Sequence, residues 1–378
     1  MNAYIVDFAR SPFQFARKGK FAGLRPDDLA AQVVRALMAR QPFEPALIED
    51  LIAGCAYPEG EQGDNLARIV GLLAGLPDTI AGITMNRFCG SSMSAIHMAA
   101  GNIAAGAGDA FLCIGVESMT RVPQGGLSSS PNPKLLEGAP QAYISMGMTA
   151  ENVAKRYAIS RAEQDAFAVA SQRKAAAAFE AGAFAKEVVA VKLPDGSVVD
   201  GDGCLRPATS MEGLAALKTV FLADGSVTAG TSSPLTDGAS AVLVASEAFV
   251  RTHGLKPLAQ IKSIAVAGVP PEVMGIGPVP ATRKALARAG LALDDIDLIE
   301  LNEAFAAQAL ACVMELGLDP AKVNLDGGAL AIGHPLGATG ARITGKAAAL
   351  LQREGKRYAL ATQCIGGGQG IATILEAV

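Results

Sequence analysis

The sequence predicts an α/β fold built from two similar halves, and three observations lead to this prediction. Short apolar segments alternate with alanine-rich segments of helical length along most of the 378 residues. Several of these segments recur about 247 residues later in the chain. The middle of the chain instead has the composition of loops around one long helix. Because strands that alternate with helices form βαβ units, we expect largely parallel sheets.

The individual elements are predicted from the spacing and type of the apolar residues. The expected strands are short runs of strand-forming residues at Tyr4–Phe8, Leu51–Cys55, Ala110–Gly115, Ala241–Ala245, Leu298–Leu301 and Tyr358–Thr362. The expected helices are longer and rich in alanine, at Leu29–Ala39, Ser91–Ala105, Arg161–Ala181, Ala281–Ala289, Glu303–Leu316 and Ala338–Gln352.

The repeat sets the expected domain organisation. Its three matched pairs are 49–53 with 297–301, 91–105 with 338–351, and 109–115 with 357–363. Residues 1–118 and 235–248 are therefore expected to form an N-terminal half, and residues 249–378 a C-terminal half. Residues 119–234 would be an insertion into the first half, rich in turn signals and placed to cover a binding site.

Composition excludes several classes of protein. Charged residues make up 18% of the chain and apolar residues 50%, which argues against disorder. The formal net charge of −4, with no basic stripe, argues against nucleic-acid binding. No long uninterrupted apolar stretch or charged leader is apparent, so we expect a cytoplasmic protein that does not enter a membrane. The low charge also predicts a homo-oligomer, in which a second subunit covers part of the surface.

The six cysteines include no CxxC pair, so a metal site or a thioredoxin-like site is not expected. Four of them are interpreted as structural, namely Cys55, Cys113, Cys204 and Cys312. Cys89 directly precedes an expected helix, where the helix dipole and free N–H groups favour a thiolate and a lowered pKa. A packed, unreactive thiol is the alternative interpretation of Cys89.

Three further segments carry groups that can take part in chemistry. His334 lies in the glycine-rich segment Gly327–Gly337, which leaves its imidazole uncrowded, although a plain turn histidine would fit the same pattern. Cys364 ends an expected strand and is followed by Gly366 and two more glycines, whose N–H groups could bind an oxyanion. Asn302 stands where a strand ends and a helix begins, and could cap that helix.

Taken together, these segments resemble the active-site loops of the thiolase family. The four loops are Asn86–Ser92, Asn302–Phe305, Gly333–Pro335 and Cys364–Gly368, and the resemblance extends from about Ile5 to Ile374. Thr228–Ala239 is similar to the coenzyme A loop of that family, and Val273–Ala281 to another family segment. The resemblance implies a thiolase fold, in which two βαβαβαββ halves form five αβαβα layers with an inserted loop domain.

The resemblance also implies a role for each residue. Cys89 would be the nucleophile that carries the acyl group, with His334 as its general base. Cys364 would be the second acid/base, and Asn302, through a water, would hold the thioester oxygen with His334. The N–H groups of Cys89 and Gly366 would form the oxyanion hole.

The resemblance further implies the substrates and their contacts. Coenzyme A and acyl-CoA are the expected ligands, and no metal or other cofactor is expected. Ser233 stands where the family contacts the pantetheine arm, and Met146, Met274 and Phe305 would shape the acyl pocket. Arg206 and Lys218 are candidates for the coenzyme A phosphates, although ordinary solvated charges are the favoured interpretation of each.

Two features favour the degradative subgroup, which cleaves 3-oxoacyl-CoA. Ser145 stands where biosynthetic members carry histidine, and Cys89–Ser92 reads Cys-Gly-Ser-Ser rather than Cys-Ala-Ser-Gly. Biosynthetic condensation of two acetyl-CoA molecules remains the main alternative. A 3-oxoacyl synthase, a non-catalytic acyl-CoA-binding relative and a cysteine hydrolase are more distant alternatives. The family implies at least a dimer, so a homodimer and a homotetramer both remain open.

Overall fold

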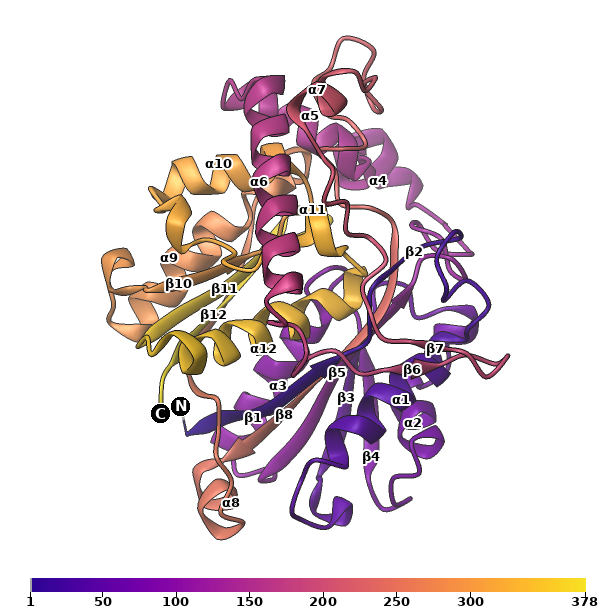
Figure 1. The fold of residues 1–378 in the computed structure, drawn as a ribbon, viewed down its shortest axis with the longest axis vertical. Helices are drawn as coiled ribbons and strands as arrows, with labels where there is room; N and C mark the ends of the chain where they lie inside the picture. The colour runs from indigo at the N-terminus through magenta and orange to yellow at the C-terminus, as the bar shows by residue number, and fades with distance from the viewer. Residues whose placement is uncertain (1) are drawn as a thin grey trace.

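The computed structural model describes residues 2–378 and shows two halves with the same order of elements (Figure 1). The N-terminal half contains β1 (Ala3–Arg10), α1 (Pro26–Met38), β3 (Asp50–Gly54), α2 (Leu66–Leu73), β4 (Ala81–Met85), α3 (Ser91–Ala104), β5 (Ala110–Ser118) and β8 (Thr236–Ser246). The C-terminal half contains β9 (Ala259–Gly268), α9 (Pro278–Ala289), β10 (Leu298–Leu301), α10 (Ala306–Leu316), α12 (Leu336–Glu354), β11 (Tyr358–Ile365) and β12 (Gln369–Glu376). In place of a third strand, the second half has a single parallel bridge between Ile299 and Val323.

The remaining elements are short or belong to the insertion between β5 and β8. The insertion holds α4 (Pro133–Gly138), α5 (Met146–Arg156), α6 (Arg161–Glu180), β6 (Val191–Lys192), β7 (Val198–Val199) and α7 (Met211–Ala215). Outside it lie β2 (Gln14–Phe15), α8 (Glu247–Thr252) and α11 (Ala329–Ile332). Single 3-10 turns occupy Pro45–Leu47, Gly60–Gln62, Pro140–Tyr143, Pro271–Ile276, Leu293–Asp295 and Pro320–Lys322.

The strands form one continuous path in the order β4-β3-β5-β8-β1-β9-β12-β11-β10. The two halves join where Tyr4 and Ile5 of β1 pair with Gln260 and Ala259 of β9. Helices α3 and α12 pack on each other and against strands of both halves, so they form a central layer. Helices α1 and α2 cover the outer face of the first half, and α9 and α10 that of the second (Figure 1). The expected five αβαβα layers are therefore present.

Three apolar clusters correspond to these layers. One lies between α1, α2 and the first half-sheet, a second surrounds α3 and α12, and a third lies under α9 and α10. Strand β8 is buried along its whole length, because it lies in the interior of the strand path. This buried frame fixes the carboxyl ends of the strands, from which the active-site loops begin.

The expectation of largely parallel sheets is wrong. Among the paired strands of residues 2–378, only β3–β4, β3–β5 and β10–β11 are parallel, whereas β8, β9 and β12 pair antiparallel with their neighbours. Strand β12 follows β11 through a tight glycine turn at 366–368, which forces the chain to reverse. The predicted helix at Glu303 begins instead at Ala306, with Phe305 as its N-cap, so Asn302 does not cap it.

Local signals explain the clearest helix ends. Helix α1 begins with Pro26 at its first position and two aspartates in its first turn, both of which favour a helix start. Helix α6 begins with a complete capping box between Ser160 and Glu163.

Within residues 2–378, no helix is long and apolar enough to cross a membrane. The domain bounds placed at 118, 234 and 248 stay predictions.

Candidate active site

Cys89 lies in the short loop between β4 and α3, as the sequence predicted. Phe88 before it has a φ of 42°, and Gly90 after it is the N-cap of α3. A side chain at Gly90 would collide with Ile365 of the other half. The thiol is half-buried, and the backbone N–H groups of Gly366 and of Cys89 itself interact with it. These are the two groups expected to form the oxyanion hole.

The predicted lowering of the Cys89 pKa is wrong. Burial, together with the charge of the buried Glu117 carboxylate, raises the pKa of Cys89 to about 12. The two backbone N–H groups oppose this rise but do not offset it. The helix dipole is a local effect, whereas distant segments of the chain bury the thiol. Cys89 is therefore a neutral thiol at rest and needs a base before it can attack.

His334 lies between α11 and α12 and is buried. Its Nδ1 atom is 2.6 Å from Thr339 Oγ1, and its backbone N–H donates to Thr236 Oγ1 over 3.1 Å. Gly333 before it has a φ of 110°, and a Cβ there would lie 2.8 Å from the Thr236 side chain. Burial, together with the charge of Arg342, lowers the pKa of His334 to about 3. The imidazole is therefore neutral and free to accept a proton.

Asn302 follows β10 and is fully buried beside the imidazole. Its Nδ2 atom lies 3.4 Å from His334 Nε2 and 3.5 Å from His334 Nδ1. Its Oδ1 atom is buried without a hydrogen-bond partner among residues 2–378. An unpaired buried acceptor is unfavourable, so this atom is placed to accept a hydrogen bond from a ligand or a water.

Cys364 lies near the end of β11 and is buried. Burial raises its pKa well above that of a free thiol, and the charge of Cys89 contributes, which places the two sulfur atoms in the same site. The following turn uses positive φ values at Gly367 and Gly368, of 77° and 82°. Gly366 lies between Cys364 and this turn, and its N–H reaches Cys89.

The residues expected to bind the substrate lie on the insertion side of the site. Met274 and Phe305 form one apolar cluster with Cys364, and Met146 packs against it. Ser233 is half-buried, and its N–H donates to Ala304 O over 3.0 Å. The structure thus brings the three apolar residues to the second thiol, while Ser233 lies beside the Asn302 loop.

The two candidate phosphate contacts are both exposed residues of the insertion. Arg206 stacks over the Phe15 ring at 4.8 Å from its centroid, and Lys218 lies beside the short helix α7. Ser145 is the N-cap of α5, and its side chain accepts from the N–H of Met148. Ser145 thus has a structural function at the position where biosynthetic members carry histidine. Among residues 2–378, no cluster of three or more metal-ligating side chains is present.

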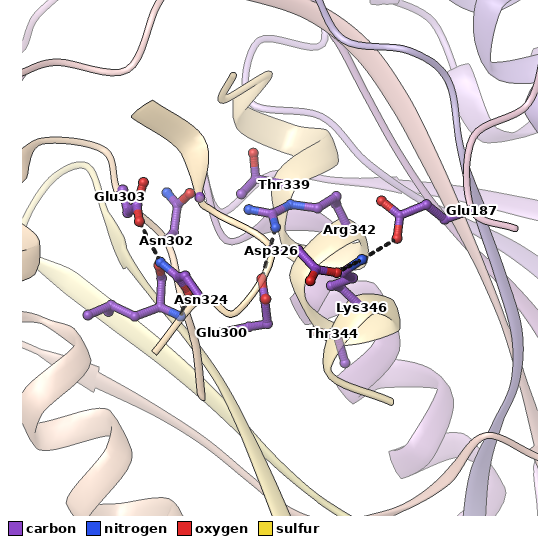
Figure 2. Close-up of polar contacts among 12 residues, drawn as sticks. Glu187, Glu300, Asn302, Glu303, Asn324, Asp326, Thr339, Arg342, Thr344 and Lys346 are labelled. Atoms are coloured by element: carbon purple, nitrogen blue, oxygen red, sulfur yellow. Dashed lines mark hydrogen bonds and ion pairs between the residues drawn. The ribbon is translucent and has the colours of Figure 1, made fainter. Parts of the chain in front are cut away.

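A chain of buried charges lies along the side of α12 (Figure 2). Arg342 pairs with Glu300 over 2.8 Å. One turn further along α12, Lys346 pairs with Asp326 over 2.5 Å and with Glu187 over 2.9 Å. All five side chains are buried, so each charge requires its partner. These residues were not predicted as site residues, although two cations four positions apart in an expected helix could have indicated them.

Three more residues near the site were missed by the sequence analysis. Thr339 contacts the imidazole, Gln363 donates to the backbone oxygen of Cys89, and Glu117 influences the Cys89 thiol. Gln363 and Glu117 are polar residues within apolar strands, a signal that could have drawn attention to them. Their contacts come from other parts of the chain, so the sequence alone does not reveal what they touch.

Fold and site together define a class of α/β proteins that place two thiols and an imidazole where two similar halves meet. Residues 3–248 match the family model "Thiolase, N-terminal domain", and residues 255–377 match "Thiolase, C-terminal domain". The chain belongs to the thiolase family.

Full-length relatives and a solved structure agree with this assignment. The chain is 50% identical to a 3-ketoacyl-CoA thiolase of Shewanella denitrificans, with 100% of both chains covered. It is 47% identical to a 3-ketoacyl-CoA thiolase of Bacillus subtilis, with 99% of both covered. The crystal structure of human mitochondrial 3-ketoacyl-CoA thiolase superposes with a TM-score of 0.92 at 38% identity, covering 100% of this chain and 98% of that one. The predicted thiolase fold is confirmed.

Proposed function

We propose that this protein cleaves 3-oxoacyl-CoA with coenzyme A, giving acetyl-CoA and a shortened acyl-CoA. The observation that carries the proposal is the convergence of Cys89, His334 and Cys364 from both halves of the fold. Relatives named 3-ketoacyl-CoA thiolase, similar over their whole length, support the same reaction. The reaction uses coenzyme A as a substrate and requires no metal or other cofactor.

The first half of the reaction transfers the acyl group to Cys89. Neutral His334 accepts the thiol proton as the sulfur attacks the 3-keto carbonyl carbon. The N–H groups of Cys89 and Gly366 stabilise the negative oxygen that develops. The bond between C2 and C3 then breaks, the C3 oxyanion reforms a carbonyl, and the electron pair forms the enolate of acetyl-CoA. Asn302 and His334 hold the enolate oxygen, and Cys364 supplies the proton to C2.

The second half transfers the acyl group to coenzyme A. The Cys364 thiolate takes the proton of the coenzyme A thiol, whose sulfur attacks the acyl-Cys89 thioester. The Cys89 sulfur leaves and recovers its proton from the imidazolium of His334. Both cysteines and the histidine are then restored, and each proton is accounted for. The raised pKa values of both thiols fit this cycle, because each must hold its proton at rest.

The degradative direction is favoured over biosynthetic condensation. Ser145 caps α5 and does not provide the imidazole that biosynthetic members place there. The acyl pocket would be formed by Met146, Met274 and Phe305, with the pantetheine arm along Ser233. Arg206 and Lys218 are exposed near the insertion and would meet the phosphates of coenzyme A.

The surface around β4 supports a homo-oligomer. Strand β4 ends the strand path, so its outer edge has no partner strand within residues 2–378. Apolar side chains are exposed on this edge and on the neighbouring α2, including Ile83, Leu72 and Leu73. An apolar open edge favours pairing with a second copy of the chain. We place this oligomer in the cytoplasm, and light scattering of the purified protein would measure its subunit number.

The reaction is tested with acetoacetyl-CoA and longer 3-oxoacyl-CoA substrates in the presence of coenzyme A. Loss of the enolate absorbance and appearance of acetyl-CoA are expected with the wild-type protein. The Cys364→Ala variant is expected to lose condensation, which requires removal of the C2 proton. Cys89 should still accept an acyl group from acetyl-CoA, but more slowly, because Cys364 no longer protonates the leaving coenzyme A thiolate. No turnover with any chain length would overturn the proposed reaction, and loss of acylation in Cys364→Ala would overturn the division of roles.

A further inference from the structure

Glu117 is a fully buried carboxylate near the end of β5. Within residues 2–378 no cation pairs with it, and its surroundings consist of hydrogen-bond donors. Its two oxygens accept from five groups: Ala56 N (2.8 Å), Tyr57 N (3.2 Å), Gly337 N (3.0 Å), Gln62 Nε2 (3.0 Å) and Cys55 Sγ (3.6 Å). A buried charge normally requires a partner, so a carboxylate held only by donors calls for an explanation.

The five contacts fit an ionised carboxylate. An ionised carboxylate accepts hydrogen bonds only, and every neighbour given for Glu117 can donate one. One of the donors, the N–H of Gly337, belongs to the first turn of α12, whose positive dipole end stabilises a negative charge. Burial raises the pKa of Glu117, and the hydrogen bonds counteract that rise.

These contacts join the two halves of the molecule at a place where their backbones lie close together. The loop after β3 belongs to the first half, and the start of α12 belongs to the second. A Cβ at Gly337 would lie 2.8 Å from the Cα of Cys55 and 2.9 Å from Glu117 Oε2. A Cβ at Gly115 would lie 2.7 Å from the Cα of Ala338. Glycines therefore permit the approach, and Glu117 accepts hydrogen bonds from the backbone of both the 55–57 loop and the start of α12.

The 55–57 loop and the start of α12 both pack near the nucleophile Cys89. Ala56 and Leu336 lie in one small apolar cluster, and Tyr57 and Cys89 pack against it. The N–H of Leu336 also donates to the carbonyl oxygen of His334 over 2.9 Å. The loop and the helix start that Glu117 holds are therefore the segments that surround the thiol and carry the imidazole.

We propose that Glu117 is a positioning residue, whose carboxylate holds the 55–57 loop and the start of α12 so that Cys89 and His334 keep one relative geometry. This inference rests on the proposed function, because it assigns Glu117 to the same reaction. Glu117 does not touch the substrate in this scheme. It acts through the backbone of two segments, one from each half.

The charge of Glu117 gives the proposal a second, electrostatic readout. It raises the pKa of Cys89, so removing it makes the thiolate easier to form. The other titratable groups of this region are Cys55, which donates to Glu117, and Tyr57, Cys364 and His334. A substitution that keeps these four groups and changes only Glu117 therefore tests its charge.

Two variants separate the charge from the geometry. Glu117→Gln keeps the size but removes the charge and places a donor against the backbone N–H groups. Glu117→Asp keeps the charge but is too short to reach both segments at once. We expect each variant to lower kcat for thiolysis by about 10- to 100-fold, because small misplacements of reacting groups have effects of this size. KM should change by less than about twofold, because Glu117 makes no substrate contact in this scheme.

The second measurement is the rate at which iodoacetamide alkylates Cys89 at a fixed pH, followed by mass spectrometry of the Cys89 peptide. Glu117→Gln should react faster than the wild type, and Glu117→Asp should react at the wild-type rate. The matched control is Glu151→Gln, which changes another buried carboxylate held by backbone N–H groups, in the insertion. It should leave the alkylation rate of Cys89 unchanged.

The outcomes are decisive in both directions. Lower kcat in both variants, with faster alkylation only in Glu117→Gln, supports the proposal. Wild-type kcat in either variant, or a loss confined to KM, overturns it, as does equal alkylation of the two variants. If Glu117→Gln does not fold, the proposal is decided by the kcat and KM of Glu117→Asp, provided that its Tm equals that of the wild type. Alkylation requires no turnover, so a wild-type protein inactive on every 3-oxoacyl-CoA would instead overturn the proposed function.

Discussion

Helices α3 and α12 occupy equivalent places in the two halves but differ sharply in charge. They are related by the offset of 247 residues, which pairs Ala95 with Arg342 and Ala99 with Lys346. Helix α3 contains no Asp, Glu, Lys or Arg, whereas α12 has two buried cations on one face. In the first half, the loop with the Cys89 thiol is followed by the uncharged helix α3. In the second half, the loop with the His334 imidazole is followed by α12, whose buried cations are paired with carboxylates.

The contact between the two helices explains how they can differ. Where they meet, both present small groups: the N–H of Ala341 donates to Ser92 Oγ over 2.8 Å, and a Cβ at Gly340 would lie 2.7 Å from the Cβ of Met93. The cations of α12 lie on another face, toward Glu300, Asp326 and the insertion (Figure 2). The two copies of a duplicated fold can therefore keep the face on which they pack together, while the residues on their other faces differ in charge.

Removing a buried cation from α12 should have the largest effect, and that effect is on stability. Arg342→Met leaves Glu300 buried without its closest cation, and we expect it to lower the free energy of unfolding by about 3–5 kcal/mol. Arg342→Met combined with Glu300→Gln should recover most of that loss, because both charges are then removed. Chemical denaturation measures all three proteins.

The control for this prediction is an exposed ion pair. Arg283 pairs with Glu315 at the surface over 3.2 Å, and Arg283→Met should change stability by less than about 1 kcal/mol. If Arg342→Met and Arg283→Met have equal effects, the buried charges of α12 do not stabilise the fold in the way the contacts indicate.

The next effect concerns the imidazole that precedes α12. Thr339→Val removes the hydroxyl that lies 2.6 Å from His334 Nδ1, so the ring loses the contact that orients it. We expect kcat to fall by about 100-fold, the usual contribution of a positioned general base, and Thr339→Ser to restore most of it. The matched control is Thr344→Val, which removes another buried hydroxyl of α12, bonded to Gly340 O. Equal losses of kcat in the two valine variants would contradict an orienting role for Thr339.

A smaller effect is expected at the thiol. Gln363→Met keeps the shape of the buried side chain but removes the donor to the carbonyl oxygen of Cys89. Losing one hydrogen bond of this kind should lower kcat by about tenfold. Gln164→Met removes a similarly buried amide from the insertion, bonded to Ser226 Oγ, and should change kcat much less. An unchanged kcat in Gln363→Met would show that the Cys89 backbone holds its position without this bond.

The sequence marked candidate site residues more clearly than it indicated the pairing of the strands. Cys89, Asn302 and Cys364 lie at or just after the carboxyl ends of strands, and each is marked by residues beside it in the chain. Such local motifs can be recognised without knowing which strands are neighbours. The antiparallel pairing of β8 and β9 with their neighbours depends on contacts between distant segments, which no local pattern records. The pairing of β12 with β11 is different, because the glycine turn at 366–368 is a local signal for it.

The same limit explains the wrong pKa prediction and the missed residues. The helix start beside Cys89 is local, whereas burial by Ile365 and the charge of Glu117 come from elsewhere in the chain. Thr339 could be identified only once the position of the His334 ring was known. Sequence reasoning therefore identified groups capable of chemistry, and only the fold could give their protonation states.

The smallest expected effect is that of pH on acylation, and it tests those protonation states. The pKa of Cys89 is raised to about 12 and that of His334 lowered to about 3, so neither group titrates in the neutral range. The reactive pair is then a neutral thiol and a neutral imidazole, and the rate of Cys89 acylation by acetyl-CoA should change little between about pH 5 and about pH 9. Alkylation by iodoacetamide uses the thiolate and should rise about tenfold per pH unit over the same range. The contrary outcome is an alkylation rate that stops rising with pH within this range, as the acylation rate does. Cys89 and His334 would then form a thiolate–imidazolium pair at rest, because the attraction between the two charges would outweigh the cost of burying them.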